Sequence, residues 1–198
     1  RLRVVHRWTA PVSGAGKEGI DELDAQVREH SEGREMTANI LPSASAEKHY
    51  PIAFNLIPQI DVFCDNLYTK EEMKMVNETK KIMEDYEMRI TATTIRVPVY
   101  RSHSESVNIE LEKEVDLGAM REALAKFPGV TVQDDPSKQE YPMPLYTSEK
   151  DDVYVGRLRR DESCEKSYNM WVVGDQIRKG AALNTLQIAE TMIKNGWI

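Results

Sequence analysis

The order of strand-like and helix-like segments constrains the fold of this chain more than any other feature. Segments 88–99 and 106–115 are rich in Ile, Thr and Val, and no helical pattern separates them. Shorter strands are predicted over 3–8, 130–132, 153–159 and 169–173. Because strands and helices do not alternate strictly as in βαβ units, the pattern favours an α+β domain with a mixed, mostly antiparallel sheet.

The clearest helix signal begins at Thr69. Thr69 and Glu72 match a capping box, in which each side chain satisfies a free backbone amide. The helix is predicted to run to about residue 86 with a broad buried face, formed by two neighbouring stripes: Met73, Val76 and Met83, and Met75, Ile82 and Tyr86.

Three further helices are predicted, over 20–30, over 116–127 and from Asp175 or Gln176 to Gly196. Between the first helix and the one at Thr69, segment 31–50 has no periodicity, and segment 51–58 is apolar but irregular because of its two prolines. Segment 106–115 alternates apolar and polar residues, so we expect one of its faces to be wet.

Composition excludes several classes of protein. The 198 residues carry a net charge of −7, which argues against a nucleic-acid partner, and no apolar stretch is long enough to span a membrane. The two cysteines cannot form a disulfide framework, which fits the reducing cytoplasm. The four histidines are scattered, so we expect no metal cofactor. The chain begins at Arg1 rather than Met, so a missing N-terminal part must be considered.

The glycines of segment 14–19 match the G-x-G-x-x-G pattern of dinucleotide-binding turns. That motif requires a complete βαβ unit, and here the predicted helix runs into the aperiodic segment 31–50 instead. The pattern therefore favours a tight turn or a secondary ligand contact over a primary nucleotide site.

Segment 96–104 is the most chemically equipped part of the chain, because Arg96, Arg101 and His103 lie together among hydroxyl side chains. On one regular strand Arg96 and His103 would point to opposite faces, since an odd number of positions separates them. Both can line one cleft if Pro98 bends the strand. A solvated edge strand is the alternative, and these residues alone leave both open.

Glu71 and Lys74 lie three positions apart in the first turns of the predicted Thr69 helix. From spacing alone they are neighbours and would ordinarily form a surface ion pair worth a few tenths of a kcal/mol.

Taken together, a series of short motifs resembles the C-terminal part of the aspartate-β-semialdehyde dehydrogenase family, over nearly the whole chain from Val12 onward. The order and spacing of the motifs make coincidence improbable. They are Val12–Gly16, Ile52–Asp61, Glu71–Lys74, Arg96–Val99 with Arg101–Ser104, Val155–Arg157, and Gly174–Gln176 with Lys179–Asn184.

The resemblance implies an NADP-dependent oxidoreductase that interconverts β-aspartyl phosphate and aspartate 4-semialdehyde through a cysteine thioester, for lysine, threonine and methionine synthesis. Its fold would be that of the C-terminal domain of glyceraldehyde-3-phosphate dehydrogenase. By motif, His103 resembles the acid/base, Arg96 the substrate carboxylate fork, Glu71 the contact to the substrate amino group and Lys74 the phosphate contact.

The same resemblance assigns cofactor contacts to Ser13, Gly14 and Gln176. It implies a catalytic and dimerisation domain over 12–175, a homodimer, and a C-terminal helix over 176–198 that packs on a cofactor-binding Rossmann domain absent from this chain.

Segment 1–11 departs from the family. Ala10 stands where a substrate-orienting glutamine belongs, and the family's nucleophile, in an Asn-Cys-Ser/Thr motif, lies upstream of residue 1. Neither Cys64 nor Cys164 occupies such a motif. We therefore expect the isolated chain to be inactive; the alternative is a non-catalytic dimerising remnant of the family.

Overall fold

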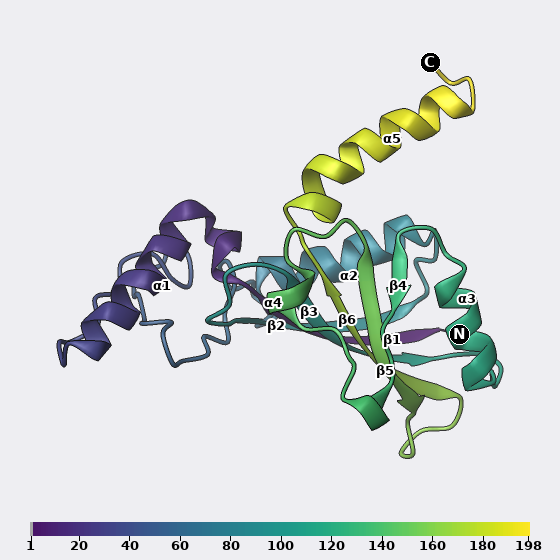
Figure 1. The fold of residues 1–198 in the computed structure, drawn as a ribbon, viewed down its shortest axis with the longest axis horizontal. Helices are drawn as coiled ribbons and strands as arrows, with labels where there is room; N and C mark the ends of the chain where they lie inside the picture. The colour runs from purple at the N-terminus through teal and green to yellow at the C-terminus, as the bar shows by residue number, and fades with distance from the viewer. Residues whose placement is uncertain (1) are drawn as a thin grey trace.

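The protein forms one six-stranded sheet with helices packed around it, in a computed structural model that describes residues 2–198 (Figure 1). The strand order is β2-β1-β3-β6-β5-β4. Three neighbouring pairs are antiparallel and two are parallel, which confirms the predicted α+β class with a mixed, mostly antiparallel sheet. The strands are β1 (Arg3–Ala10), β2 (Arg89–Arg96), β3 (His103–Glu110), β4 (Val130–Val132), β5 (Val153–Arg160) and β6 (Ser167–Gly174).

Four of these strands begin or end at the same edge of the sheet. Strands β1 and β2 are parallel and end together, with Ala10 opposite Arg96. Strand β3 runs the other way and starts at His103, which pairs with Gly174 at the end of β6. This end of the sheet, called the His103 edge below, includes the last residues of β1, β2 and β6 and the first residue of β3.

The structure resolves the geometry of Arg96 and His103 differently from the prediction. They do not share a bent strand: Arg96 ends β2 and His103 begins β3, and the central strand β1 lies between those two strands. The connection over 97–102 crosses the end of β1 and includes Ser102 in a left-handed conformation, with φ of 70°. The alternation argument therefore does not apply to this pair, because alternation holds only within one strand.

The Thr69 capping box is present, and helix α2 (Lys70–Ile82) follows it along β2. The predicted buried face is wrong in its second half. Ile82, Met83 and Tyr86 are 77%, 56% and 69% exposed. The helix ends at Ile82, short of the predicted residue 86, and Glu84 is left-handed with φ of 53°, so Tyr86 does not share its face. Helix α3 (Leu117–Ala125) packs on β4 and β5, and Asp116 caps it as predicted.

Helix α1 (Gly16–Ser31) and the aperiodic chain after it form a second, small core beside the sheet (Figure 1). Two polar side chains of α1 hold that chain through its backbone. Gln26 is fully buried and accepts hydrogen bonds from the amides of Ile52 and Ala53, while Glu22 accepts two from residues 39 and 40. The apolar residues of this core are Val12, Leu23, Leu41, Ile52, Ala53 and Ile57.

Segment 51–58 is not a strand; its one sheet contact is an isolated bridge between Ile57 and Arg96. The polar face of β3 is not uniformly wet either. Asn108 is 6% exposed, and its amide donates to Asp161, Ser167 and Asn169. The predicted wet face fails here because neighbouring polar side chains satisfy one another.

After β6 the chain makes a π-helical turn, η3 (Arg178–Ala182), and continues as helix α5 (Leu183–Lys194). Figure 1 shows α5 projecting away from the sheet. Leu186, Ile188 and Ile193 on this helix are 58%, 54% and 64% exposed. Within residues 2–198, no helix is long and apolar enough to cross a membrane.

Candidate active site

Arg96 is a buried cation at the His103 edge. Its side chain is 4% exposed, and Nη1 donates a hydrogen bond of 2.8 Å to the carbonyl of Pro11. Its buried Nε has no partner within the described residues. Burial lowers the pKa of Arg96, and the nearby negative charge of Glu71 acts in the opposite direction. Arg96 therefore offers an unused donor at a place where an anionic ligand would be strongly attracted.

Gly14 lies directly against this guanidinium. The short helical turn η1 (Val12–Ala15) carries Gly14 past Arg96, and a Cβ atom at Gly14 would come within 2.6 Å of Nη1. The absence of a side chain at Gly14 is therefore what allows Arg96 its position.

His103 lies beside Arg96 and is half-buried. Its ring packs edge-on against Trp8 in β1, with 4.2 Å between ring centroids. Burial lowers the pKa of His103 to about 3; the positive charge of Arg96 adds to this effect, and Asp175 opposes it. The imidazole is consequently neutral near pH 7 and can accept a proton.

Ser13 and Gln176 join the site from opposite ends of the sequence. The amide of Gln176 donates to Ser13 Oγ over 2.7 Å and accepts from the backbone N–H of Ser102 over 3.1 Å. These bonds connect η1, the 97–102 connection and the end of β6.

Asp175 is a site residue that the sequence did not single out, although it directly precedes Gln176. Its carboxylate is fully buried and accepts hydrogen bonds from the backbone N–H groups of Glu149, Ile177 and Arg178. It therefore caps the turn after β6 and also places a negative charge near His103. From the sequence, Asp175 was interpreted as a possible helix start and as part of the Gly174–Gln176 motif, with no role at the site.

Glu71 and Lys74 form the predicted pair at the start of α2. Lys74 Nζ lies 3.1 Å from Glu71 Oε2, and the two side chains are 57% and 21% exposed. The hydrogen bond from Lys74 to Glu71 is the main reason that the pKa of Lys74 is raised. Since the charge of Glu71 also acts on Arg96, the pair belongs to the surroundings of the same site.

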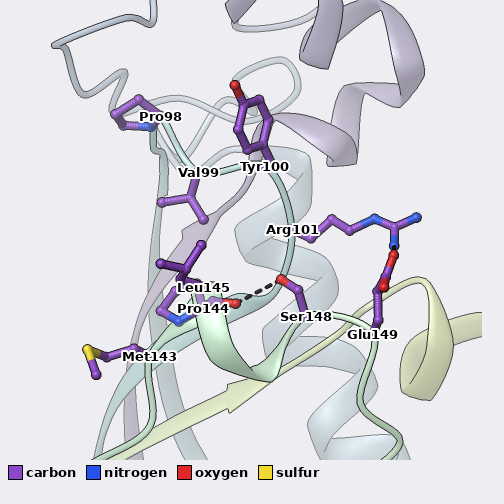
Figure 2. A pocket seen from close by; sticks show the side chains of 9 residues that line it. All are labelled: Pro98, Val99, Tyr100, Arg101, Met143, Pro144, Leu145, Ser148 and Glu149. Atoms are coloured by element: carbon purple, nitrogen blue, oxygen red, sulfur yellow. Dashed lines mark hydrogen bonds and ion pairs between the residues drawn. The ribbon is translucent and has the colours of Figure 1, made fainter.

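A pocket lies next to this site. Figure 2 shows its wall, in which Pro98, Val99, Tyr100 and Arg101 of the 97–102 connection face residues around helix α4 (Pro144–Thr147). Its volume is about 620 Å³, and the ion pair between Arg101 and Glu149 closes one side. None of the seven candidate residues lines it, so the pocket adjoins the chemical groups without containing them.

The described residues contain no group of three or more side chains suited to hold a metal ion. Cys164 lies in the turn between β5 and β6, at the end of the sheet opposite the His103 edge. Cys64 lies in the loop before α2.

Comparison with known proteins connects this geometry to one family. The sequence profile described as "Semialdehyde dehydrogenase, dimerisation domain" matches residues 3–179. The chain belongs to this family. The match begins with β1 and ends in the turn after β6, so it includes every strand of the sheet and all seven candidate residues.

Two curated relatives of this semialdehyde dehydrogenase domain share a name. Aspartate-semialdehyde dehydrogenase of Aquifex aeolicus is 48% identical over 196 residues, covering 99% of this chain and 56% of the relative. The Bacillus subtilis protein of the same name is 48% identical over 184 residues, covering 92% of the chain and 53% of the relative. The chain thus spans about half the length of the curated relatives it matches, in agreement with the predicted C-terminal part.

Solved structures agree. Aspartate semialdehyde dehydrogenase II of Vibrio cholerae, complexed with ASA, matches with a TM-score of 0.88 and 40% identity over 97% of this chain and 55% of that chain. The Candida albicans enzyme with NADP matches with a TM-score of 0.66 and 21% identity, covering 99% of this chain and 51% of that one. The second likeness is one of fold alone.

Proposed function

We propose that this chain is the substrate-binding and dimerisation part of an NADP-dependent oxidoreductase that interconverts β-aspartyl phosphate and aspartate 4-semialdehyde. The observation that supports this most directly is the placement of Arg96 and His103 side by side at one edge of the sheet, with Ser13 and Gln176 bonded to each other beside them. Family membership and the names of the relatives agree with the proposal.

Each side chain has a distinct task in this proposal. Arg96 binds the substrate carboxylate, because a guanidinium pairs with a carboxylate through two parallel hydrogen bonds. Glu71 accepts from the substrate amino group, and Lys74, the more exposed partner of the pair, contacts phosphate. Lys74 also lies in the first turns of α2, where the helix dipole favours an anion.

His103 acts as the acid/base, and binding of substrate at Arg96 tunes it. In the free chain, burial and the charge of Arg96 both hold the pKa of His103 low, at about 3. A carboxylate bound at Arg96 neutralises the second cause, so the pKa of His103 rises when substrate is present. His103 thereby becomes a better proton acceptor only in the complex that needs it.

NADP fits this chain only in part. Ser13 Oγ and the Gln176 amide can contact one end of a dinucleotide, but they are already bonded to each other and do not enclose a ligand. Ser13, Gly14 and Gln176 would line the nicotinamide end, where the cofactor would accept a hydride in the oxidation of the aldehyde and supply one in the reverse reaction. The remaining binding surface and the nucleophilic cysteine are assigned to the half of the protein that this chain does not span, and α5 is proposed to pack on that half.

The proposal also includes a homodimer, in keeping with the family description. Cytoplasmic location follows from a biosynthetic role in lysine, threonine and methionine synthesis.

The test is the formation of NADPH from aspartate semialdehyde, phosphate and NADP⁺ by the complete protein that contains this chain. In the variant R96Q we expect the KM for aspartate semialdehyde to rise about 10–100-fold, since hydrogen bonds to charged groups contribute about 1.5–3 kcal/mol. R96K, which keeps the charge and loses the fork, should lie between R96Q and wild type. Arg101 offers a matched control, because its ion pair with Glu149 is exposed, and R101Q should leave that KM unchanged.

No activity in the folded wild-type protein would contradict the proposal and favour the second candidate, a non-catalytic dimerising remnant. The position of Ala10 favours that alternative. Ala10 is 2% exposed and faces Arg96 across β1 and β2, so it supplies no polar group to a substrate there.

A further inference from the structure

Trp8 packs against the candidate acid/base. The indole and imidazole centroids are 4.2 Å apart, and the rings are inclined by 72°, an edge-to-face arrangement. In β1, Trp8 lies opposite Thr94 of β2 and Glu105 of β3. Because His103 lies two residues before Glu105, Trp8 and His103 extend from the same face of the sheet.

His103 has no other orienting contact of this kind within residues 2–198. Neither nitrogen of its ring makes a hydrogen bond to another described side chain or backbone group. A histidine that moves protons commonly has one ring nitrogen fixed by a carboxylate or a carbonyl. Here the packing of a neighbouring ring takes the place of that bond.

The indole of Trp8 is itself almost fully buried. It is 9% exposed, and its Nε1 is buried without a hydrogen-bond partner among the described residues. A buried unpaired donor lowers stability, so packing in the core does not by itself account for an indole at this position.

We infer that Trp8 is a positioning residue for His103: its indole fixes the plane of the imidazole and keeps water from one side of that ring. The charged groups around His103 come from its own strand and from two other elements. Arg96 at the end of β2 opposes a charged imidazole, and Asp175 after β6 favours one. Glu105, on the same face of β3, is bonded to His6.

Nuclear magnetic resonance of the ring carbons of His103 in the chain tests this directly. In the wild-type chain we expect no titration of His103 between about pH 5 and pH 8, since burial keeps its pKa low. In W8L, water reaches the ring, and His103 should titrate within that range. W8F retains an aromatic ring and should resemble wild type. W171F removes a tryptophan from β6 and is the matched control, in which His103 should not titrate in that range.

If His103 in folded W8L still does not titrate between about pH 5 and pH 8, the inference is overturned. Equal titration in W8L and W171F would overturn it as well, because any loss of a large side chain would then suffice. If W8L fails to fold, W8A or W8V is measured in its place. A His103 ring that does not titrate between about pH 5 and pH 8 in that variant contradicts the positioning role of Trp8, and a ring that titrates supports it.

A second measurement uses the complete protein and rests on the proposed function for the role of His103. W8L should lower kcat for aspartate semialdehyde about tenfold or more, with KM within about twofold, and W8F should recover most of the loss. Unchanged kcat in W8L would contradict the positioning role. Inactive wild-type protein would instead refute the proposed function, while the resonance of His103 would still decide the role of Trp8.

Discussion

Replacing Gly14 with alanine should displace the buried guanidinium on which the candidate site depends. The new Cβ would lie 2.6 Å from Arg96 Nη1, 3.6 Å from Cζ and 3.9 Å from Nη2, so it meets the whole guanidinium. The backbone of Gly14 is not in the left-handed region, so the substitution acts through this contact and not through backbone strain.

The size of the effect follows from the contact that must change. Ordinary van der Waals separation begins near 3.4 Å, so Nη1 has to move by about 0.8 Å. Nη1 also makes the 2.8 Å bond to the carbonyl of Pro11, and because Arg96 is only 4% exposed, water compensates little for the loss of that bond. Loss of a hydrogen bond to a charged group costs about 1.5–3 kcal/mol, so G14A should lower the folding equilibrium constant about 10–100-fold.

Urea unfolding of the chain, followed by circular dichroism, measures this change. Gly180 provides the matched control, because its added Cβ would lie 3.7 Å from Gln176 Cβ, an ordinary contact. G180A should be neutral or slightly stabilising, as Gly to Ala changes in helical turns usually are. A free energy of unfolding for G14A within about 0.5 kcal/mol of wild type would refute the claim that Gly14 makes room for Arg96.

Three further predictions concern stability. T69A should lower the free energy of unfolding, measured in urea, by about 1 kcal/mol, because it removes the acceptor for the Glu72 amide. T69S keeps a hydroxyl and should recover most of the loss. G156A should cost at least about 1–3 kcal/mol, since its Cβ would lie 2.2 Å from the carbonyl oxygen of Gln133, and stability equal to wild type would contradict the packing of β5. His103 has its pKa lowered to about 3 in the folded chain, below the unfolded value near 6.5. The unfolded state therefore binds the proton first, so the contribution of His103 to the free energy of unfolding is complete above pH 6.5 and falls by about 1.4 kcal/mol per pH unit below it. The H103Q chain should lack this pH dependence. If the free energies of unfolding of the two chains fall in parallel with pH, His103 does not contribute in this way.

Local signals in the sequence gave correct boundaries where neighbouring residues decide the structure. The Thr69 capping box begins α2 and Asp116 caps α3, because a cap satisfies amides within three residues of itself. The strands of the sheet were predicted within a few residues for the same reason, since alternation and β-branched residues act along one segment.

Long-range contacts accounted for the errors. Ile82 shares an apolar stripe with the half-buried Met75 yet is exposed, because periodicity reports which side chains share a face and not what covers it. Tyr86 lies beyond the end of the helix at Ile82. The segment after α1 has no pattern of its own and is held by Gln26 and Glu22, whose bonds span 11 to 27 positions.

In the candidate site too, local sequence indicated the residue types, and the tertiary structure decided their contacts. Its residue types were evident from the sequence, since an arginine and a histidine with a nearby glycine turn already indicate anion binding and proton transfer, and motif order indicated the family. The sequence left the relative placement of Arg96 and His103 open, and Trp8 and Asp175 were not recognised as their neighbours. Only the sheet decides those contacts, because inserting β1 between β2 and β3 brings residues nearly a hundred positions apart to one edge.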